Sequence, residues 1–388
     1  MLLALSIGTI ALTVAGMAYS LLCLRAARRF HESPAPPAAG FTPAVSVLKP
    51  VRGADPEAYE NFRSLCAQAY PEFEIIFGVA DAADPAVTVI ERLIADHPDR
   101  PIRLVVCPQV LGANRKVSSL IQMLAQARYS HLIIADSDIR VRPDYLRRVL
   151  APLADPAVGM VTCLYRGVPT PTLGSMLESV TTAVHFAPGV LAARLLDGGL
   201  RFALGSTIAT TRDALGKIGG FEPLVDHLAD DYELGARTAA AGLKVVLSDL
   251  VVDHYVPPYS LAGFLKHQLR WGRGMRHSRP AGYAGLFVTY LLVWAVTAAA
   301  LLSITPAGSF AFTQAAAAVL TAGIAFRLAL VASVGMRVLG DRALWRRLWL
   351  IPLCDVLGLL VWAGSYLGRQ VTWRGERFSL ERGKLRPR

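Results

Sequence analysis

Cysteine is scarce in this 388-residue sequence, and the five cysteines that occur are isolated from one another. No CxxC or CxxH spacing joins them, which argues against a zinc site and against a disulfide framework. Motifs of nucleic-acid-binding proteins are also lacking, although the net charge is +11. The charge is spread over membrane flanks and loops, which suits an anionic lipid leaflet and a phosphorylated substrate better than nucleic acid. We therefore expect a reducing, cytosolic location and no nucleic-acid partner.

Charged residues are missing from the first part of the chain. Met1 to Leu24 is nearly continuous apolar sequence, and Arg25, Arg28 and Arg29 follow it. The run is too long for a signal peptide, and the arginines lie on the wrong flank for cleavage. With 53% hydrophobic residues and a mean hydropathy of +0.41, the chain is too apolar for a soluble protein. We expect residues 1–24 to be a retained transmembrane anchor and residues 25–43, rich in proline and alanine from 31 onward, to be a linker.

Charge is rare again in the last third of the chain. Three long apolar runs fall within residues 281–368: Tyr283 to Ile304, Phe310 to Val334 and Leu348 to Leu367. Each is long enough to cross about 30 Å of hydrocarbon as a helix. A buried helical bundle is the alternative, but the low charge and the interfacial Trp and Tyr residues favour membrane helices. Residues 369–388 form a basic tail.

The topology of these runs carries a conflict. The basic flank after the first span places the following domain in the cytoplasm, and three further crossings would leave the basic tail outside. One assumption must fail. The weakest is that residues 348–367 span the membrane, since Pro352 and Asp355 interrupt the apolar run. This segment could instead be re-entrant or lie at the interface.

Residues 44–280 have a different texture. Short apolar strands are expected at 45, 74, 103, 131, 158 and 243, and they alternate with helical patterns near 56–69, 85–96, 116–128 and 143–151. Such alternation indicates helices packed on a mostly parallel sheet, so the fold class is α/β.

Two aspartates follow the strand expected at 131. Asp136 and Asp138 come where that strand should end, and the carboxyl ends of parallel strands open onto the ligand cleft. Two carboxylates placed there can share a divalent cation that carries a diphosphate. The alternative is a strand-to-helix turn in which Asp138 or Asp144 caps the helix beginning near Pro143.

Two further acidic pairs have the same ambiguity. Asp81 and Asp84 follow the strand at 74, where they could hold a base or ribose, although Asp84 before a proline is commonly a helix cap. Asp230 and Asp231 open an amphipathic helix, where one of them is a candidate general base. Adjacent aspartates raise one another's pKa. Capping by the other aspartate is compatible with that role.

Basic residues gather at two places. The run 266–276 (KHQLRWGRGMR) surrounds Trp271 with Lys and Arg, as expected for a diphosphate and acceptor site or for a juxtamembrane helix that contacts anionic lipid heads. The loop 111–116 (LGANRK) could cradle a phosphate through Lys116. Its alternative is a solvated turn with Gly112 at positive φ.

The order and spacing of these motifs resemble the ceramide glucosyltransferase-like family of membrane glycosyltransferases, inverting enzymes of GT-A fold. The resemblance runs over nearly the whole chain. It rests on VSVLKPVRG at 45–53, DPA at 84–86, LGANRK at 111–116, DSD at 136–138, ADDY at 229–232, RW at 270–271 and WRGERF at 373–378.

The resemblance implies a role for each matching residue. Asp84 would contact the uridine, Asp136 the nucleotide, and Asp138 a divalent metal, Mg2+ or Mn2+, that bridges the diphosphate. Asp231 would deprotonate the acceptor hydroxyl. Arg270 and Trp271 would complete the diphosphate and acceptor side, and Lys116 is a further candidate for nucleotide-sugar binding. His267 stands where the family usually has Gln or Arg, so it is a weaker candidate.

The resemblance also implies substrates and a location. Phrases such as GANRKVSSLIQML and DHLADDYELGA look similar to the bacterial hopanoid-associated enzymes, which implies transfer of N-acetylglucosamine from a UDP-sugar to a hopanoid polyol in the bacterial inner membrane. The main alternative is a ceramide glucosyltransferase using UDP-glucose. A processive polysaccharide synthase and an inactive lipid-binding scaffold are further alternatives. Little material for a polymer channel and an intact set of aspartates argue against these two.

Overall fold

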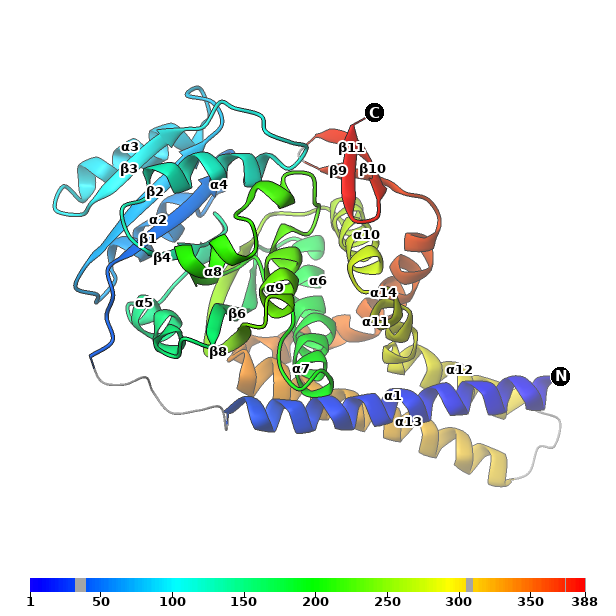
Figure 1. Cartoon of the computed structure of the whole chain (residues 1–388). Helices are drawn as coiled ribbons and strands as arrows, with labels where there is room; N and C mark the ends of the chain where they lie inside the picture. Colours follow the sequence, from blue (N-terminus) through cyan, green and yellow to red (C-terminus); the bar gives the residue numbers. More distant parts are fainter. Residues whose placement is uncertain (32–39, 305–309, 374, 388) are drawn as a thin grey trace. The chain divides into compact units, whose positions relative to one another are not determined.

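The structure is a computed structural model that describes residues 1–31, 40–304, 310–373 and 375–387. The chain forms two compact units, each built from separated segments (Figure 1). Unit 1 comprises Met1–Glu32, Pro171–Leu195 and Tyr259–Arg369; unit 2 comprises Ser33–Thr170, Leu196–Pro258 and Gln370–Arg388. This division differs from the contiguous segments expected from the sequence, because residues 171–195 and 259–280 pack with the apolar helices and the tail packs with the sheet.

An eight-stranded sheet forms the centre of unit 2, in the order β3-β2-β1-β4-β7-β6-β8-β5. The strands are β1 (Val45–Val51), β2 (Phe73–Val79), β3 (Ile102–Val106), β4 (His131–Ile134), β5 (Ile139–Arg140), β6 (Val158–Pro169), β7 (Ile208–Thr211) and β8 (Lys244–Val256). Strands β3, β2, β1 and β4 are parallel, β6 is parallel to β8, and β7 runs antiparallel to both β4 and β6. All six strands expected from the sequence are confirmed, whereas β5 and β7 were missed; β5 has only two residues, and β7 (IATT) contains no run of large apolar residues.

Helices connect these strands. They are α2 (Ala58–Cys66), α3 (Ala86–Asp96), α4 (Arg115–Gln126), α5 (Tyr145–Leu150), η1 (Ala151–Ala154), α8 (Arg212–Lys217), η3 (Glu222–Leu224) and α9 (Asp230–Ala240). The four helices expected in this region are confirmed within a few residues. Strands β1 and β2 are buried almost throughout, as expected for strands covered by helices on both faces. The predicted α/β class with a mixed, mostly parallel sheet is confirmed.

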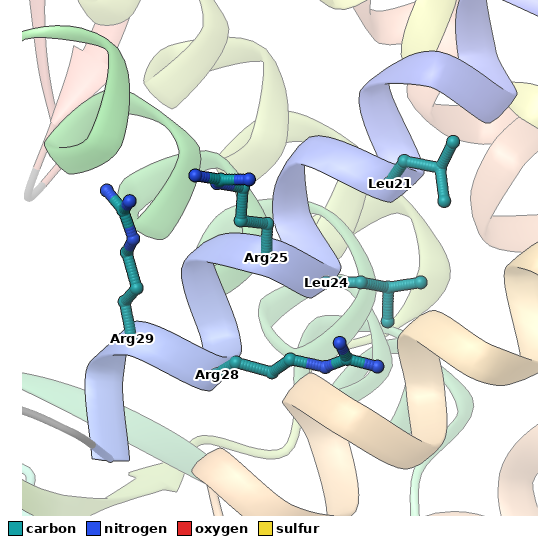
Figure 2. Close-up of a pocket in the computed structure, with 5 residues that line it drawn as sticks. All are labelled: Leu21, Leu24, Arg25, Arg28 and Arg29. Carbon is teal, nitrogen blue, oxygen red and sulfur yellow. The ribbon is translucent and has the colours of Figure 1, made fainter.

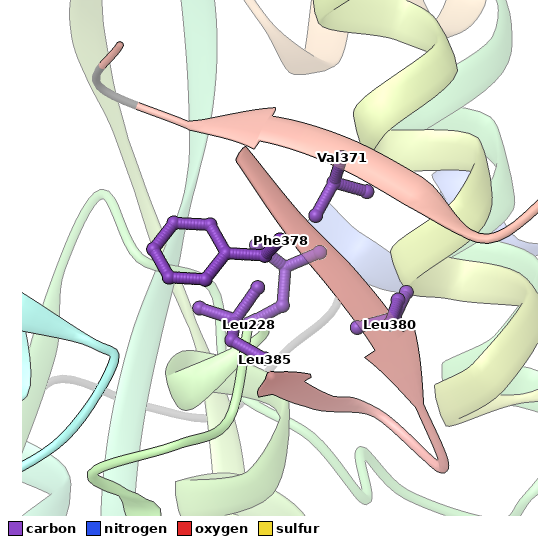
Figure 3. Close-up of a cluster of buried hydrophobic side chains, with 5 residues drawn as sticks. All are labelled: Leu228, Val371, Phe378, Leu380 and Leu385. Atoms are coloured by element: carbon purple, nitrogen blue, oxygen red, sulfur yellow. The ribbon is translucent and has the colours of Figure 1, made fainter. Parts of the chain in front are cut away.

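The basic tail forms a second, three-stranded antiparallel sheet. Its strands are β9 (Gln370–Trp373), β10 (Glu376–Glu381) and β11 (Lys384–Pro387). Apolar side chains from all three strands pack on Leu228 (Figure 3), and they are Val371, Phe378, Leu380 and Leu385. Alternation of apolar and polar residues along each strand produces this one-sided packing.

Unit 1 is helical. It contains α1 (Leu2–His31), α6 (Leu173–Thr181), η2 (Thr182–Phe186), α7 (Ala187–Leu196), α10 (Leu261–Ser278), α11 (Pro280–Gly285), η4 (Leu286–Thr289), α12 (Leu291–Ile304), α13 (Phe310–Leu330), η5 (Val331–Val338), η6 (Arg342–Leu350) and α14 (Ile351–Tyr366). Among the described residues, four helices are long and apolar enough to cross a membrane: Leu2–Phe30, Leu173–Leu196, Ala311–Val338 and Arg342–Tyr366. A fifth candidate is the pair Pro280–Thr289 and Leu291–Ile304, which is bent by 47°. Helices α1, α12 and α13 pack against one another along their length (Figure 1).

Candidate active site

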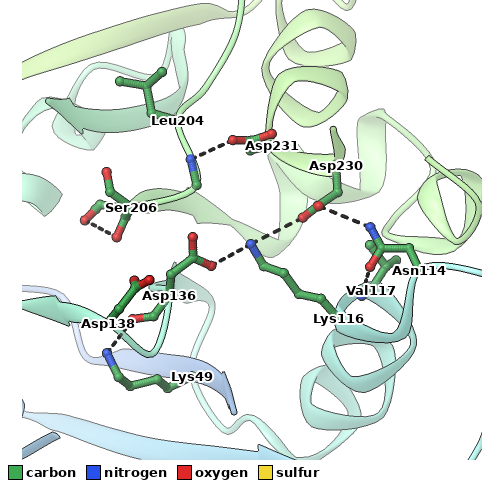
Figure 4. A network of polar contacts seen from close by, with 12 residues as sticks. Lys49, Asn114, Lys116, Val117, Asp136, Asp138, Leu204, Ser206, Asp230 and Asp231 are labelled. Carbon is green, nitrogen blue, oxygen red and sulfur yellow. Dashed lines mark hydrogen bonds and ion pairs between the residues drawn. The ribbon is translucent and has the colours of Figure 1, made fainter. Parts of the chain in front are cut away.

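The aspartates that follow β4 lie at the carboxyl end of the parallel strands, as expected. Ala135 still pairs with β1, since its N–H donates to the Leu48 carbonyl, and the chain turns directly after it. Asp136 and Asp138 therefore emerge where the sheet opens (Figure 4). Neither caps α5, because that helix begins at Tyr145 and has no side-chain cap. The capping alternative is wrong for Asp138.

Asp136 belongs to a chain of charges that reaches α4 and α9. The Lys116 Nζ atom lies 2.7 Å from Asp136 Oδ1 and 3.5 Å from Asp230 Oδ2. Asn114, fully buried, donates from Nδ2 to Asp230 Oδ1 at 3.2 Å and caps α4 through Oδ1 (Figure 4). Burial opposes the charge of Lys116, but the carboxylates of Asp136, Asp230 and Asp231 outweigh it and raise the lysine pKa. Lys116 thus holds the acidic groups together.

Asp231 faces Asp136 across the backbone of Gly205. The Gly205 N–H donates to Asp231 Oδ2 at 2.8 Å, and the Asp231 Oδ1 atom accepts from the Tyr232 N–H at 2.8 Å. Burial and the neighbouring Asp230 charge raise the Asp231 pKa to about 6, against the attraction of Lys116. The two hydrogen bonds fix the orientation of the Asp231 carboxylate. Its pKa allows it to take up a proton near neutral pH.

Gly205 was not singled out in the sequence, and its importance comes from space rather than from backbone conformation. A Cβ atom on it would lie 3.0 Å from Asp136 Oδ2 and 3.1 Å from Asp231 Oδ2. Only a residue without a side chain leaves both carboxylates in place. Gly205 therefore contributes to the site through its backbone N–H.

The Gly205→Ala variant is expected to fold normally but to turn over at least about tenfold more slowly, because small displacements of reacting groups are costly. The Gly216→Ala variant is the matched control, since a Cβ atom there meets nothing within 4 Å. Turnover and thermal unfolding of both purified variants test this. Equal turnover in the two variants would contradict the proposed place of Gly205.

Asp138 has a different surrounding from Asp136. His254 Nε2, on β8, lies 3.2 Å from Asp138 Oδ2. Burial disfavours the charged carboxylate, but His254 and the Lys49 charge outweigh it and lower the Asp138 pKa to about 2. Asp138 is therefore ionised at all physiological pH values. The two aspartates differ: one is paired with an ammonium group, and the other with an imidazole.

Lys49 is a further residue that was missed as a site residue. It lies on β1, is fully buried, and its Nζ atom donates to the backbone carbonyls of Asp136 at 2.7 Å and Ile139 at 3.5 Å. Burial lowers the lysine pKa to about 8, although Asp138 and Asp136 oppose this shift. The Lys49 ammonium thus holds the turn that carries both aspartates. A lysine in the apolar strand VSVLKP was the one available signal.

The donor set at Asp138 fits a hard divalent cation. A carboxylate oxygen and an imidazole nitrogen are ligands that Mn2+ accepts, and Mg2+ is commonly held by one or two carboxylates with substrate phosphates. Within the described ranges, no group of three or more His, Cys, Asp or Glu side chains is arranged to hold a metal ion. The expected Mg2+ or Mn2+ would therefore need the diphosphate for its remaining ligands.

Asp84 is engaged by backbone groups. Its carboxylate accepts from the Gly53 N–H at 2.9 and 3.0 Å and from the Ala86 N–H at 2.9 Å. It therefore fastens the loop after β1 to the start of α3, with Gly53 at a φ of 74°. Asp81 accepts from the Ala83 N–H in the same turn. The capping expectation for Asp84 is confirmed, and its contact with a uridine stays a prediction.

The loop 111–116 is fixed by contacts rather than solvated. The prediction of a positive φ at Gly112 is wrong; instead, a Cβ atom there would meet the Val225 carbonyl oxygen at 2.6 Å. The Asn114 N–H donates to that carbonyl at 2.6 Å, and the Ala113 N–H donates to Asp226 Oδ1 at 3.0 Å. Hydrogen bonds to Val225 and Asp226, in the loop that precedes Asp230, thus fix the loop that precedes Lys116.

The tail sheet supports the same loop. The Leu385 N–H donates to the Asp226 carbonyl at 2.7 Å, and the Leu228 N–H donates to the Gly383 carbonyl at 3.1 Å. Leu228 lies in the apolar cluster of the tail, two residues before Asp230 (Figure 3). The last strands of the chain therefore fix the segment that leads into α9.

The Phe378→Ala variant is expected to lower the free energy of unfolding by about 3 kcal/mol, because it removes a buried aromatic side chain. Amide hydrogen exchange in residues 226–231 should accelerate more than in β1. The Thr372→Ala variant, exposed on the same small sheet, is the control. Unchanged exchange at 226–231 in the Phe378 variant would show that the tail does not support the loop.

Arg270 and Trp271 lie on α10, which belongs to unit 1, whereas the other predicted site residues belong to unit 2. His267 contacts both of them: its Nδ1 atom is 3.3 Å from Arg270 Nη2, and its ring lies 5.4 Å from the Trp271 ring. The Trp271 ring also lies 5.6 Å from the Phe186 ring, measured between ring centroids. The departure at His267 therefore keeps a contact with the Arg-Trp pair. Roles for Arg270 and Trp271 in binding stay predictions.

Comparison with solved structures identifies the fold. The mannosyltransferase PcManGT from Pyrobaculum calidifontis, in complex with GDP-Man and Mn2+, has a TM-score of 0.56 and 23% identity to this chain, and covers 88% of this chain and 100% of that one. The predicted GT-A fold is confirmed. The model of Glycosyl transferase family 21 matches residues 8–386, and the chain belongs to this family.

Curated relatives narrow the resemblance. Ceramide glucosyltransferase 1 of Caenorhabditis elegans is 28% identical over 207 residues, which are 53% of this chain and 44% of that protein. The ceramide glucosyltransferase of Komagataella phaffii is 34% identical over 108 residues, 27% of this chain and 21% of that protein. The chain thus spans half or less of the length of these relatives. They favour the ceramide alternative, and they do not support the predicted closeness to hopanoid-associated bacterial enzymes.

Proposed function

We propose that the chain transfers a hexose from a UDP-sugar to the hydroxyl of a membrane lipid, with inversion at the anomeric carbon. The observation that carries this proposal is Asp231, held by the Gly205 N–H beside Asp136 with a pKa of about 6. A positioned carboxylate of that pKa suits the deprotonation of an attacking hydroxyl. Membership of glycosyl transferase family 21 supports the reaction class.

The reaction would use the residues of unit 2 in distinct ways. Asp231 accepts the hydroxyl proton while the hydroxyl oxygen bonds to the anomeric carbon, and the bond from that carbon to the diphosphate breaks. Lys116 keeps Asp136 and Asp230 in place, and Lys49 fixes the turn that carries Asp136 and Asp138. Because the acceptor oxygen attacks the anomeric carbon directly and Asp231 takes only its proton, a single displacement inverts that carbon without a covalent intermediate.

Asp138 and His254 would hold a divalent cation, Mg2+ or Mn2+, together with the donor diphosphate. The cation would supply Lewis-acid stabilisation of the charge on the departing UDP. Arg270, Trp271 and Asp84 would bind the diphosphate, the acceptor and the uridine, respectively, as the family resemblance implies. The PcManGT structure, with GDP-Man and Mn2+, supports a nucleotide sugar and a divalent ion for this fold.

Ceramide is the acceptor and glucose the sugar that the curated relatives support. The hopanoid polyol with N-acetylglucosamine is the acceptor and sugar that the sequence phrases favoured. Both acceptors present a hydroxyl at the membrane face, and the catalytic unit would work on the cytosolic side of that membrane. One experiment distinguishes transfer of glucose to ceramide from transfer of N-acetylglucosamine to a hopanoid polyol.

The purified full chain in detergent with lipid is supplied with Mn2+ and, separately, UDP-glucose or UDP-N-acetylglucosamine, with ceramide or hopanoid polyol as acceptor. UDP release and mass spectrometry of the lipids are measured. We expect a hexose on ceramide. A hexosamine on the hopanoid would reverse the acceptor assignment. UDP release that requires no lipid, or no release with any pair, would overturn lipid glycosylation itself.

A further inference from the structure

The tail sheet limits how often the chain can cross a membrane. The chain leaves unit 2 after Pro258 and returns to it at Gln370. Within unit 2, the Leu385 N–H donates to the Asp226 carbonyl and the Leu228 N–H donates to the Gly383 carbonyl, so hydrogen bonds join the two sides of this interval. The side chains of Leu385 and Leu228 share one apolar cluster. Residues before 258 and after 370 therefore lie on the same side of any bilayer, so the intervening chain crosses it an even number of times.

Three candidate spans lie in that interval: the bent pair Pro280–Ile304, Ala311–Val338 and Arg342–Tyr366. An even number cannot include all three, so at least one does not cross. The same reasoning applies to Leu173–Leu196, because the chain belongs to unit 2 on both sides of it, at Thr170 and Leu196. A single crossing by that helix is excluded, although its length and hydropathy would permit one.

The bent pair and Ala311–Val338 have the character of crossing segments. No charged residue occurs between Ala281 and Phe326. Helix α12 packs against α1 and α13, so the three form one apolar bundle (Figure 1). Arg327, the first charge that follows, is buried at 3% exposure and pairs with Asp355. Hydrocarbon can surround a bundle of this kind.

Segment Arg342–Tyr366 differs from these two segments because exposed Arg and Trp side chains lie near its N-terminal end. Arg342 and Arg346 are exposed, and Trp345 and Trp349 are 59% and 64% exposed on the same short helix, η6. A lipid-facing arginine in the hydrocarbon core costs several kcal/mol, whereas Trp and Arg are favoured together at the headgroup level. The charge of Asp355 is not evidence against a crossing by this segment, because the side chain is fully buried and accepts a hydrogen bond from the Leu292 N–H at 3.0 Å.

The rest of this segment is too short to cross by itself. Without η6, α14 has 16 residues, or about 24 Å of helix against about 30 Å of hydrocarbon. Its last turn lies against the charged helix α10: Arg273 Nη2 donates to the Leu367 carbonyl at 3.1 Å, and the Arg276 guanidinium lies 5.3 Å from the Tyr366 ring centroid. Arginines that are only partly buried are costly in hydrocarbon, which favours a position of the end of α14 outside it.

The opposite face of η6 is fixed to the protein. Arg347 forms a paired contact with Asp341 at 3.0 and 2.9 Å and donates to Ser179 Oγ on α6 at 2.5 Å. Leu344 and Leu350 are fully buried beside it. The exposed Trp and Arg side chains are thus presented outward by a rigid support, as expected for a membrane-facing surface.

The end of α1 carries arginines that, like those of η6, suit the level of the lipid headgroups. Leu21, Leu24, Arg25, Arg28 and Arg29 line a cavity of about 380 Å³ (Figure 2). Leucines followed by arginines are the lining expected where acyl chains meet phosphates. Helix α1 packs against η5, which in turn packs against η6. The arginines of α1 and of η6 therefore occur at one end of the helical bundle.

We propose that Arg342–Tyr366 does not cross the bilayer but lies at its surface on the side of unit 2. Trp345 and Trp349 are inserted among the lipid headgroups, and Arg342 and Arg346 contact lipid phosphates. Three segments then cross: α1, the bent pair Pro280–Ile304 and Ala311–Val338. All the basic flanks fall on the side of unit 2. This topology is independent of the transfer reaction, so either proposal can fail alone.

Cysteine labelling tests the topology. Full-length Arg346→Cys, Leu367→Cys, Ile304→Cys and Asp99→Cys variants are treated with a membrane-impermeant maleimide in sealed vesicles of known orientation. The unsubstituted chain is the control, since its five cysteines are buried. Arg346→Cys and Leu367→Cys should label from the same face as Asp99→Cys, and Ile304→Cys only from the other face. Labelling of Arg346→Cys and Leu367→Cys from opposite faces would overturn the proposal.

A second measurement tests the lipid contact. Tryptophan fluorescence is recorded in vesicles whose lipids carry bromine either near the carbonyl end of the acyl chains or near the methyl end. Quenching by the shallow bromine should fall in the Trp345→Phe, Trp349→Phe double variant, and quenching by the deep bromine should not change. Loss of the deep quenching instead would place the two indoles inside the hydrocarbon and contradict a surface position.

Discussion

Replacing Asp231 by asparagine is expected to lower turnover by roughly 10²- to 10⁴-fold, the usual contribution of a general base. Asparagine keeps the size of the side chain and can still accept the hydrogen bond from the Gly205 N–H. It cannot take the proton of an acceptor hydroxyl. Donor binding, measured as the affinity for UDP, should change little, because the loss is in the chemical step. Wild-type turnover in this variant would remove Asp231 as the base.

The pH dependence provides a separate check on the same residue. A base must be unprotonated to act, and the Asp231 pKa is raised to about 6 by burial and by Asp230. Turnover of the unsubstituted protein should therefore rise as the pH increases through about 6 and level off above it. This limb should vanish from the residual activity of the Asp231→Asn variant. The Asp213→Asn variant, on an exposed helix, is the matched control and should keep it.

Replacing Asp138 by asparagine is expected to weaken divalent-ion binding and to lower turnover by roughly a hundredfold or more, since metal ions contribute several kcal/mol to such steps. The neutral amide no longer offers the carboxylate that faces His254. Electron paramagnetic resonance of added Mn2+ in the presence of UDP measures the loss of binding directly. This measurement of Mn2+ binding does not depend on enzyme activity.

The variant His254→Gln separates the two parts of the same site. An amide keeps a polar contact with Asp138 but is a poorer ligand than an imidazole, so a smaller rise in the Mn2+ dissociation constant is expected. The Asp144→Asn variant, near the start of α5, is the control. If Asp138→Asn binds Mn2+ with UDP as well as the unsubstituted protein does, the ion is held elsewhere.

Strand and helix periodicity was enough to predict much of unit 2. The strands around Val47, Ile75 and Ile133 are short, mostly apolar segments, and each is bounded by polar or turn residues. A strand that is followed at once by Asp136 and Asp138 places both residues at the sheet edge, because chain direction is fixed in a parallel sheet. The local sequence pattern therefore predicted where Asp136 and Asp138 lie, but it did not predict which residues contact them.

The partners required the fold because they come from distant positions. Lys49 lies 87 residues before Asp136, and His254 lies 116 residues after Asp138. Gly205 carries no side chain, so no chemical signal marked it as the residue between two carboxylates. Packing alone decides such contacts, since side-chain chemistry says what a residue can bind and not which residue it will meet.

By itself, the sequence determined the α/β class, the apolar segments and the aspartates at the strand ends, because these depend on neighbours within about a dozen residues. Tertiary structure alone decided that the tail is a sheet that belongs to unit 2. Its apolar side chains are buried only where Leu228 meets them. The conflict in the membrane topology could be approached only after that contact was known. The physical reason is that burial and long-range hydrogen bonds form between segments whose separation along the chain carries no periodic signal.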